Sequence, residues 1–455
     1  MTGLERYAGQ KVGVLGIGAS GRAAARALAA AGAEVLAFDD RPTALEAVPY
    51  RRGTLADVAG LALVVPSPGV PLTHPEPHPV VAAARAAGVP IRGDVDLFAD
   101  FLGGQRIVGV TGTNGKSTTT ALIHHLLTHA GVDAVLGGNI GRPVLELEPC
   151  PPERVFVLEL SSFQLDLCDR LRCRVAVWLN LTPDHLDRHG DLAGYVAAKE
   201  RIFAGQGTDH VAVVGIDDAP SRELAYRLRG LGRRVVTVTL DEAAPAEVEV
   251  VGGRLIDATD GLPVEALDLH ALGNLRGRHN WQNVAVAYAA VRALGLTPEQ
   301  AVAGLPSFTG LPHRMEEVAR AGRVLWVNDS KATNPDSAEK SLVSFDNIFW
   351  IAGGKPKPGG FRSLRASLGK VRAGYLIGTA AAELEADLGD LVPTRRVCTL
   401  EAAVRAASQD ARGLAEGEAV VLLAPACASY DQFANFEARG DAFRTLAQAE
   451  AGGAA

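Results

Sequence analysis

One short string, residues 108–117, constrains the fold of this chain more than any other. It reads V-G-V-T-G-T-N-G-K-S, follows an apolar run, and precedes residues 118–130, which favour a helix. That order predicts a strand, a glycine-rich turn and a helix. The first N–H groups of a helix have no intrahelical partner and carry a partial positive charge. The string therefore predicts a phosphate-binding loop at the start of a helix.

The string departs from the usual nucleotide-binding loop at one position. That loop has a glycine five residues before Gly115, where this chain has Val110, so Gly112 must supply the bend. In such a loop the lysine, here Lys116, reaches the outer phosphates, and the hydroxyl, here Ser117, binds Mg²⁺. A string of this kind in a glycine-rich chain can also be an ordinary turn. The flanking strand and helix favour nucleotide binding over that alternative.

Length and composition limit the class of protein. A chain of 455 residues is expected to form about three domains, and its net charge of −7 argues against a general attraction to nucleic acid or anionic membranes. The five cysteines form no C-x-x-C pair, which argues against a disulfide framework and a zinc ribbon. No signal peptide and no apolar run of about 18 residues is evident. We therefore expect a cytoplasmic protein with no membrane span.

The first part of the chain, residues 1–104, is predicted to be a Rossmann-like unit. Predicted strands over 11–15 and 34–38 flank a G-x-G-x-x-G string at residues 16–21, and the second strand ends in Asp39. On its own this pattern predicts an NAD(P)-dependent dehydrogenase. The glycines require only a tight turn with an anion near the helix start, so the ligand stays open at this point.

Polar strings follow predicted strands in the rest of the chain, and one of them, from Gly277, begins a predicted helix. They are E-L-S-S-F-Q from Glu159, N-L-T-P-D-H-L-D from Asn180, G-R-H-N-x-x-N from Gly277, N-D-S-K-A-T-N from Asn328 and A-C-A-S-Y-D-Q-F from Ala426. Carboxyl ends of parallel strands share one edge of a sheet, where ligands bind. The pattern predicts an α/β fold of three domains, with a central, mostly parallel P-loop sheet over 105–310 and a second Rossmann-like domain over 311–455.

Three side chains, two in these strings and Lys199 in a predicted helix outside them, have both a functional and an ordinary interpretation. Glu159 is either a metal ligand or a helix cap, and His185 is either a ligand or a surface histidine. Lys199 is either functional or a solvated surface lysine. Only eight of the 45 basic residues are lysine, so a retained lysine is weak evidence that a primary amine is needed.

Together and in this order, the strings resemble the Mur ligases, ATP-dependent amide-forming enzymes of peptidoglycan synthesis. Folylpolyglutamate synthetases share that scaffold. The resemblance covers nearly the whole chain, and the last two strings with the N-terminal glycine turn most resemble the family member that adds D-glutamate. It implies that ATP phosphorylates the terminal carboxylate of UDP-N-acetylmuramoyl-L-alanine, and that D-glutamate then displaces phosphate. Another amino-acid ligase of the same scaffold is the alternative.

The resemblance also implies roles for individual residues. Catalysis is expected from Lys116, His185 and Lys199. Two Mg²⁺ ions are expected, one at Ser117 and Glu159 and one at His185 and Lys199, the latter carbamylated by CO₂. ATP is expected to contact Gly112, Thr113, Asn114, Gly115, Lys116, Ser117, Thr118, Asn280, Asn283, Arg314, Asp329 and Lys331.

The same resemblance assigns the two other substrates. The UDP-sugar, in place of NAD, is expected at Gly18, Ser20, Asp39, Asp40, Arg41, Gly69, Asn139 and Ser161. D-Glutamate is expected at Thr333, Lys357, Ser429 and Phe436. Lys355 is the alternative to Lys357, because two prolines alter that loop relative to the family's usual form. We expect a monomer that binds no nucleic acid.

Overall fold

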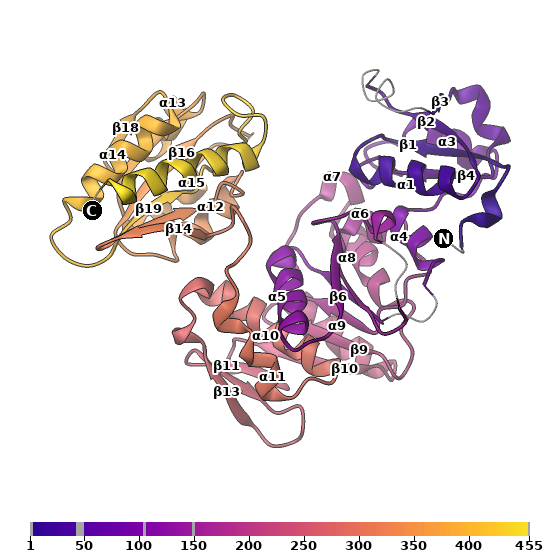
Figure 1. Ribbon diagram of the computed structural model, residues 1–455, viewed down its shortest axis with the longest axis horizontal. Helices are drawn as coiled ribbons and strands as arrows, with labels where there is room; N and C mark the ends of the chain where they lie inside the picture. Colours follow the sequence, from indigo (N-terminus) through magenta and orange to yellow (C-terminus); the bar gives the residue numbers. More distant parts are fainter. Residues whose placement is uncertain (1–2, 42–49, 103–105, 148–150, 358, 454–455) are drawn as a thin grey trace. The chain divides into compact units, whose positions relative to one another are not determined.

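The computed structural model describes residues 3–41, 50–102, 106–147, 151–357 and 359–453. The chain divides into two compact units, Met1–Phe308 and Thr309–Ala455, each of which is described by itself. Within the described residues there are three mostly parallel sheets, one in each predicted domain (Figure 1). This confirms the predicted α/β class.

The N-terminal sheet is parallel throughout its described strands. Its order is β3 (Arg51–Arg52), β2 (Glu34–Phe38), β1 (Lys11–Leu15) and β4 (Leu63–Pro66). The helices of this region are α1 (Ala19–Ala30), α3 (Pro79–Ala86) and α4 (Asp94–Ala99), with 3-10 turns η1 (Glu5–Tyr7) and η2 (Leu55–Gly60). The predicted strands over 11–15 and 34–38 are confirmed.

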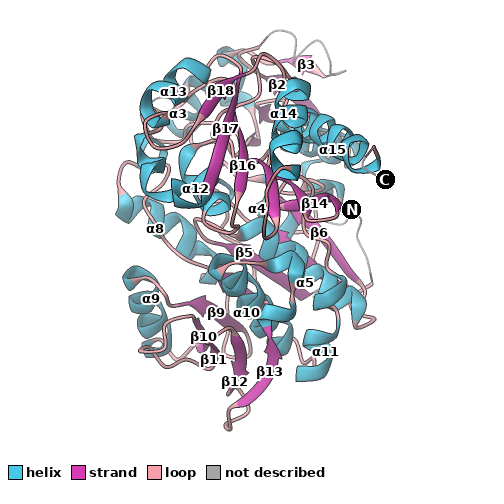
Figure 2. Ribbon diagram, turned by 90° about the vertical axis from the view of Figure 1, so that its left-hand side faces the viewer, coloured by secondary structure: helices cyan, strands magenta, loops and turns pink. Residues whose placement is uncertain are grey.

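The central sheet has the order β13-β12-β11-β10-β9-β8-β5-β7-β6 among the described residues. Its strands are β5 (Arg106–Thr111), β6 (Ala134–Gly138), β7 (Val155–Glu159), β8 (Val175–Trp178), β9 (Val211–Gly215), β10 (Arg234–Thr239), β11 (Val248–Val251), β12 (Arg254–Asp257) and β13 (Val264–Asp268). Neighbouring strands are parallel from β6 to β11, whereas β12 and β13 continue the sheet as an antiparallel ribbon. Figure 2 shows β9 to β13 side by side.

Helices connect several of these central strands, and two more helices, α10 and α11, follow β13. They are α5 (Lys116–His129), α6 (Ser162–Leu165), α7 (Leu186–His189), α8 (Leu192–Glu200), α9 (Ala219–Gly230), α10 (Arg278–Ala293) and α11 (Pro298–Ala303). The 3-10 turns are η3 (Val144–Glu146), η4 (Arg201–Phe203), η5 (Leu269–Ala271), η6 (Gly273–Leu275) and η7 (Leu305–Ser307). Helices α5 and α10 pack against each other, which brings the phosphate loop against the start of α10.

The first two sheets share a continuous apolar core, which explains why they form one compact unit. The ring of Phe98 from α4 meets the ring of Phe156 from β7 edge to face, with centroids 5.2 Å apart. The predicted boundary between residues 104 and 105 lies outside the described residues. The predicted boundary at 310–311 lies close to the division between the units at Phe308–Thr309. The three-domain division itself stays a prediction.

The second unit contains one sheet with the order β14-β15-β19-β16-β17-β18 among its described residues. Its strands are β14 (Glu316–Ala321), β15 (Val324–Asn328), β16 (Ile348–Gly353), β17 (Val371–Ile377), β18 (Thr394–Arg396) and β19 (Ala419–Leu423). Only β14 runs antiparallel to its described neighbour. The helices are α12 (Pro335–Leu342), α13 (Ala381–Leu388), α14 (Leu400–Arg412) and α15 (Phe436–Gly452), with the 3-10 segment η8 (Arg362–Lys370). None of the described helices is long and apolar enough to cross a membrane.

Candidate active site

The predicted phosphate loop lies between β5 and α5, as the sequence indicates. Gly112 has φ 149° and Gly115 has φ 85°, conformations that a residue with a side chain rarely adopts. A Cβ at Gly115 would lie 2.2 Å from the side-chain oxygen of Asn283, so that glycine is also required by packing. Val110 is a fully buried residue inside β5. The bend therefore begins after the strand, at Gly112, which accounts for the displaced glycine.

Two lysine amines converge on one carbonyl of this loop. Lys116 Nζ donates to Gly112 O at 3.0 Å and to Thr113 O at 2.9 Å. Lys199 Nζ, from α8, donates to Gly112 O at 2.7 Å. Lys199 is 1% exposed, which contradicts the interpretation of a solvated surface lysine. Burial, and then the charge of Lys116, lower the pKa of Lys199 to about 6. At neutral pH, therefore, the Lys199 amine is mostly unprotonated and nucleophilic.

The carboxylate of Glu159 lies at the end of β7, next to the loop strand β5. It is 2% exposed. Its Oε1 accepts a hydrogen bond from Asn139 Nδ2 at 2.7 Å, and Asn139 N–H donates to Glu159 O at 2.9 Å. Its Oε2 is buried and has no hydrogen-bond partner among the described residues. An oxygen left in this state fits a hard cation such as Mg²⁺.

The other predicted metal ligands meet the requirements for Mg²⁺ in part. Ser117 is buried in the first turn of α5, and a hydroxyl oxygen is a suitable ligand. The described residues contain no group of three His, Cys, Asp or Glu side chains placed to hold a metal ion. Mg²⁺ usually keeps several water or phosphate ligands and only one or two from protein. The protein therefore offers part of a coordination shell, which nucleotide phosphates would complete.

His185 occupies the position before α7 with φ 51°, an uncommon conformation for a histidine. Its imidazole is about half exposed and lies 3.4 Å from Asp184. The ring centroids of His185 and Phe163 are 4.9 Å apart. His185 and Lys199 lie against the same aromatic ring, that of Tyr195, with separations of 6.3 Å between ring centroids and 4.7 Å from Nζ to centroid. The structure thus brings together two residues that the sequence separates by a helix.

Asn280 and Asn283 lie between α10 and α5 and are both buried. Asn283 Oδ1 accepts from Thr119 Oγ1 at 3.2 Å, and Asn283 Nδ2 donates to Asn280 Oδ1 at 3.3 Å. Asn280 Nδ2 donates to Arg276 O at 2.9 Å. Asn283 therefore packs directly against Gly115 of the phosphate loop. The contact of both asparagines with the nucleotide stays a prediction. Thr118 is the third residue of α5.

In the N-terminal domain, the glycine turn is held by acidic side chains. Gly18 caps α1, and the hydroxyl of Ser20 donates to the buried Asp94, whose pKa is raised by burial. Asp39 Oδ2 accepts from Ile17 N at 2.6 Å. Although burial acts to raise it, hydrogen bonds from the Ile17 and Arg41 N–H groups hold the pKa of Asp39 below its usual value. Both carboxylate oxygens of Asp39 therefore already accept backbone hydrogen bonds that stabilise the turn.

A cavity of about 260 Å³ opens at the carboxyl end of β2. It is lined by Leu15, Phe38, Asp39, Asp40, Arg52, Gly53, Thr54, Leu55, His78, Pro79 and Val80. Asp40 is largely exposed and lies 3.3 Å from His78 Nε2. Arg41 and Gly69 are not among the lining residues.

Ser161 caps α6, where its hydroxyl accepts from Gln164 N at 3.2 Å.

The second unit carries the remaining predicted residues. Asp329 follows β15, accepts from the hydroxyl of Ser341 and is buried, and burial raises its pKa to about 6. Arg314 lies between two residues of positive φ, His313 and Met315. Lys331 Nζ lies 4.0 Å from the ring centroid of Phe436. Several residues predicted to contact ATP and D-glutamate therefore lie near the carboxyl end of β15 and the start of α15.

The loops expected to hold D-glutamate also meet. Lys355 and Ala428 exchange both backbone hydrogen bonds, at 2.8 and 3.0 Å, which places Lys355 beside the buried Ser429. Thr333 N–H donates to Lys331 O at 2.7 Å. Lys357 is exposed, and the choice of Lys357 over Lys355 stays a prediction.

Comparison with known proteins decides the family. Residues 110–291 match the model of the Mur ligase middle domain, and residues 313–427 match that of the Mur ligase glutamate ligase domain. A UDP-N-acetylmuramoylalanine–D-glutamate ligase of Nitrobacter winogradskyi is 50% identical over 452 residues, covering 97% of each chain. A protein of the same name from Paramagnetospirillum magneticum is 48% identical and covers 98% of each chain. The chain belongs to the Mur ligase family.

Solved Mur ligase structures share the fold at low identity. UDP-N-acetylmuramate-alanine ligase MurC from Thermotoga maritima superimposes with a TM-score of 0.59 at 20% identity, covering 97% of this chain and 99% of that one. MurF ligase from Thermotoga maritima, solved in complex with ADP, gives a TM-score of 0.59 at 18% identity, covering 87% and 90%.

Two residues that shape this Mur ligase site were given no role from the sequence, although one of them, Asn180, is the first residue of a predicted string. Asn180 Oδ1 accepts from Asn114 N at 2.9 Å, and its backbone oxygen accepts from Thr113 N at 3.0 Å. Tyr195 OH lies 3.2 Å from Thr113 Oγ1. Asn180 follows a strand, as the predicted residues do, so its position was an available signal. Tyr195 carries no such signal.

In the second unit, the missed residue is Arg439. Its buried guanidinium donates to Ser330 Oγ at 3.0 Å, to Ser330 O at 3.0 Å and to Cys427 O at 3.1 Å. It therefore joins the two strings that follow β15 and β19. Its position within a helix gave no reason to expect this role.

Proposed function

We propose that this Mur ligase joins D-glutamate to UDP-N-acetylmuramoyl-L-alanine and uses ATP to do so. The convergence of Lys116 and Lys199 on Gly112 O, beside a buried Glu159 oxygen without a partner, supports ATP chemistry at this loop. The names of relatives about 50% identical over 97% of the chain support the two other substrates. We place the reaction in the cytoplasm and the active enzyme as a monomer.

The reaction requires activation of a poor acylating agent. An oxygen of the alanyl carboxylate attacks the γ-phosphorus of ATP, ADP leaves, and an acyl phosphate forms. The amine of D-glutamate then attacks the acyl carbon, and inorganic phosphate leaves with the amide bond formed. Positioning and charge neutralisation supply most of the catalysis in such transfers. The role proposed for Lys116 is to neutralise the outer phosphates.

The residues at the loop fit bound Mg²⁺. Ser117 and Glu159 would hold one ion, and His185 with a carbamylated Lys199 would hold a second. Bound Mg²⁺ neutralises charge on the nucleotide phosphates. Carbamylation joins the Lys199 nitrogen to CO₂ with release of one proton, and it requires an unprotonated amine. The lowered pKa of Lys199, about 6, meets that requirement at neutral pH.

The remaining ligand contacts extend the proposal over both units. We assign the UDP-sugar to Gly18, Ser20, Asp39, Asp40, Arg41, Gly69, Asn139 and Ser161. D-Glutamate is assigned to Thr333, Lys357, Ser429 and Phe436. The nucleotide contacts assigned to the second unit are Arg314, Asp329 and Lys331.

Phosphate release from ATP tests this function. We expect release only when ATP, the UDP-sugar and D-glutamate are all present, because the amine is needed to discharge the acyl phosphate. Omission of each substrate in turn is the control. Turnover with L-alanine, L-lysine or meso-diaminopimelate, and none with D-glutamate, would assign the chain to another activity of the same scaffold. ATP binding without substrate-dependent release would contradict an enzymatic role.

A further inference from the structure

Arg188, in α7, is a buried cation to which no role has been given above. It follows His185 by one helical turn and is 6% exposed. Its Nη2 donates to Val70 O, in the N-terminal domain, at 3.2 Å. Its Nη1 lies 3.6 Å from Asp166 Oδ2, and its guanidinium carbon lies 5.5 Å from the ring centroid of Phe163. Nε and Nη1 have no hydrogen-bond partner within the described part of the chain.

The unsatisfied donors of the buried Arg188 guanidinium do not favour the folded state. A guanidinium has five N–H donors, and burying it without satisfying them is unfavourable. Burial lowers the pKa of Arg188, and the charge of Asp166 offsets this only in part. Apolar side chains of similar volume in place of a buried ion pair are often neutral or stabilising, so the pairing of Arg188 with Asp166 is weak evidence of a stabilising role. A charged residue at position 188 therefore indicates a functional requirement.

The contact of Arg188 with Val70 joins two parts of the proposed site. Val70 follows Gly69, which is assigned above to the UDP-sugar. The same turn is tied to the glycine turn before α1, because Ser67 Oγ donates to Gly16 O at 2.6 Å. On the other side, Arg188 lies in the short helix that begins directly after His185. One guanidinium thus links the loop after Gly69, which is assigned to the UDP-sugar, to the helix after His185, which is assigned to Mg²⁺.

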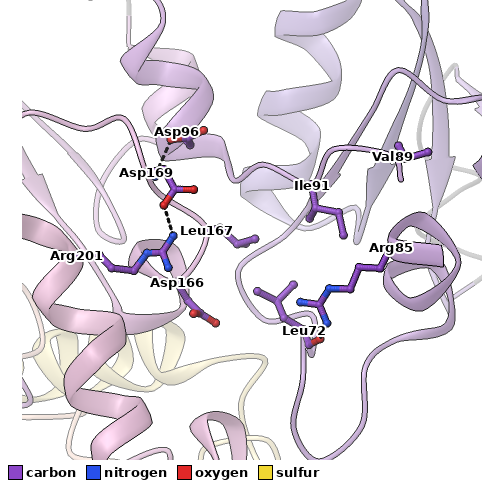
Figure 3. A pocket seen from close by; sticks show the side chains of 9 residues that line it. All are labelled: Leu72, Arg85, Val89, Ile91, Asp96, Asp166, Leu167, Asp169 and Arg201. Atoms are coloured by element: carbon purple, nitrogen blue, oxygen red, sulfur yellow. Dashed lines mark hydrogen bonds and ion pairs between the residues drawn. The ribbon is translucent and has the colours of Figure 1, made fainter. Parts of the chain in front are cut away.

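The contact between the N-terminal and central parts of the first unit combines apolar and polar interactions. A cavity of about 310 Å³ lies along it, lined by Leu72, Arg85, Val89, Ile91, Asp96, Asp166, Leu167, Asp169 and Arg201 (Figure 3). At this cavity Asp96 Oδ1 accepts from Asp169 N and Arg170 N, both at 2.8 Å. Polar links thus join the two parts beside the cavity, and the hydrogen bond from Arg188 to Val70 is another such link.

We infer that Arg188 is a positioning residue, which fixes the loop at Val70 against the loop at His185 and so presents the alanyl carboxylate of the UDP-sugar to the nucleotide. The inference rests on the proposed function, because that function defines what the two loops hold. A displacement of about 1 Å between reacting groups can reduce a rate about a hundredfold. The link to Val70 is therefore expected to affect the UDP-sugar and not ATP, because Arg188 makes no hydrogen bond to the loop at residues 111–117 within the described part of the chain.

Steady-state kinetics of the full-length variants Arg188→Met, Arg188→Lys and Arg201→Met test this inference. For Arg188→Met we expect the KM for the UDP-sugar to rise about tenfold or more, the size of a lost hydrogen bond to a charged group, with the KM for ATP within about twofold. Arg188→Lys keeps one donor and should fall between the wild type and Arg188→Met. Arg201 also borders the cavity, but its hydrogen bonds go to Cys168 O and Asp169 within the central domain, so Arg201→Met should retain the wild-type KM.

Thermal melting of the same variants separates positioning from stability. Arg188→Met should melt close to the wild type, because removal of a poorly satisfied buried charge offsets the loss of its contacts with Val70 O and with Asp166, whose carboxylate stays partly exposed to water. A lower melting temperature with an unchanged KM for the UDP-sugar would overturn the inference, and so would equal KM increases for the UDP-sugar and ATP. If Arg188→Met does not fold, a wild-type KM in Arg188→Lys would also overturn it. A wild type that is inactive with these substrates would refute the proposed function, and this inference with it.

Discussion

Replacing Lys199 with methionine is expected to stabilise the protein while abolishing its activity. The unfolded lysine has a pKa of 10.5, whereas burial and the charge of Lys116 lower the folded pKa to about 6. Between these values the unfolded chain binds one more proton than the folded chain, so stability rises with pH across this window. At pH 7 the penalty is about 4–5 kcal/mol, at about 1.4 kcal/mol per pH unit. Methionine removes that penalty.

The net gain is smaller than the full penalty. Methionine cannot donate to Gly112 O, and a lost hydrogen bond costs about 1 kcal/mol. We therefore expect Lys199→Met to be more stable than the wild type by about 3 kcal/mol at pH 7. By pH 9 the difference in stability between the two proteins should shrink by about 3 kcal/mol. Protonation of the unfolded lysine stabilises the unfolded state less as the pH approaches 10.5.

Urea denaturation of both proteins in CO₂-free buffer at pH 7 and pH 9 measures this difference. The comparison between variants cancels the titration of groups that they share. A methionine variant that is less stable at pH 7, or a stability difference that is the same at both pH values, would refute the reasoning. Added bicarbonate should stabilise only the wild type, because a carbamate needs the amine and binding to the folded state alone raises stability.

Two further substitutions test the geometry of the loop. Gly115→Ala should raise the KM for ATP at least tenfold and lower the melting temperature, because the new Cβ would lie 2.2 Å from Asn283 Oδ1 at a φ of 85°. Gly131 has a similar φ of 79°, but a Cβ added there would have no atom within 4 Å. The control variant Gly131→Ala should therefore keep the wild-type KM for ATP. Glu159→Gln keeps an acceptor for Asn139 but loses the charge, and the Mg²⁺ concentration for half-maximal rate should rise about tenfold in a titration. An unchanged Mg²⁺ dependence would argue against Glu159 as a ligand.

Much of the fold followed from local sequence patterns. Strands β1 and β2, the turn at Gly112 and the start of α5 were predictable because glycine, apolar runs and helix-forming residues act over a few positions. The N-terminal glycine turn was predictable in shape but not in ligand, because NAD and a UDP-sugar both place a pyrophosphate at a helix start. The same physics serves both, so residues 16–21 alone could not choose between them.

Contacts between distant segments were beyond this kind of prediction. Arg188 and Val70 are 118 residues apart, and no period or motif links them. The support that Asn283 gives to Gly115 likewise depends on how α10 packs on α5. The burial of Lys199 could not be predicted either, because its helix could equally have turned that side chain toward solvent. Its amine becomes unusual only because the surrounding strands and rings exclude water from it.

In the reaction that we propose, the alanyl carboxylate is activated by phosphorylation before the amide bond forms. Transfer of ¹⁸O from a labelled carboxylate of UDP-N-acetylmuramoyl-L-alanine to inorganic phosphate tests it most directly. The reaction with ATP and D-glutamate should give phosphate that carries one ¹⁸O atom for each amide bond, detected by mass spectrometry or ³¹P NMR. Phosphate without ¹⁸O, formed together with the amide, would contradict the acyl-phosphate mechanism.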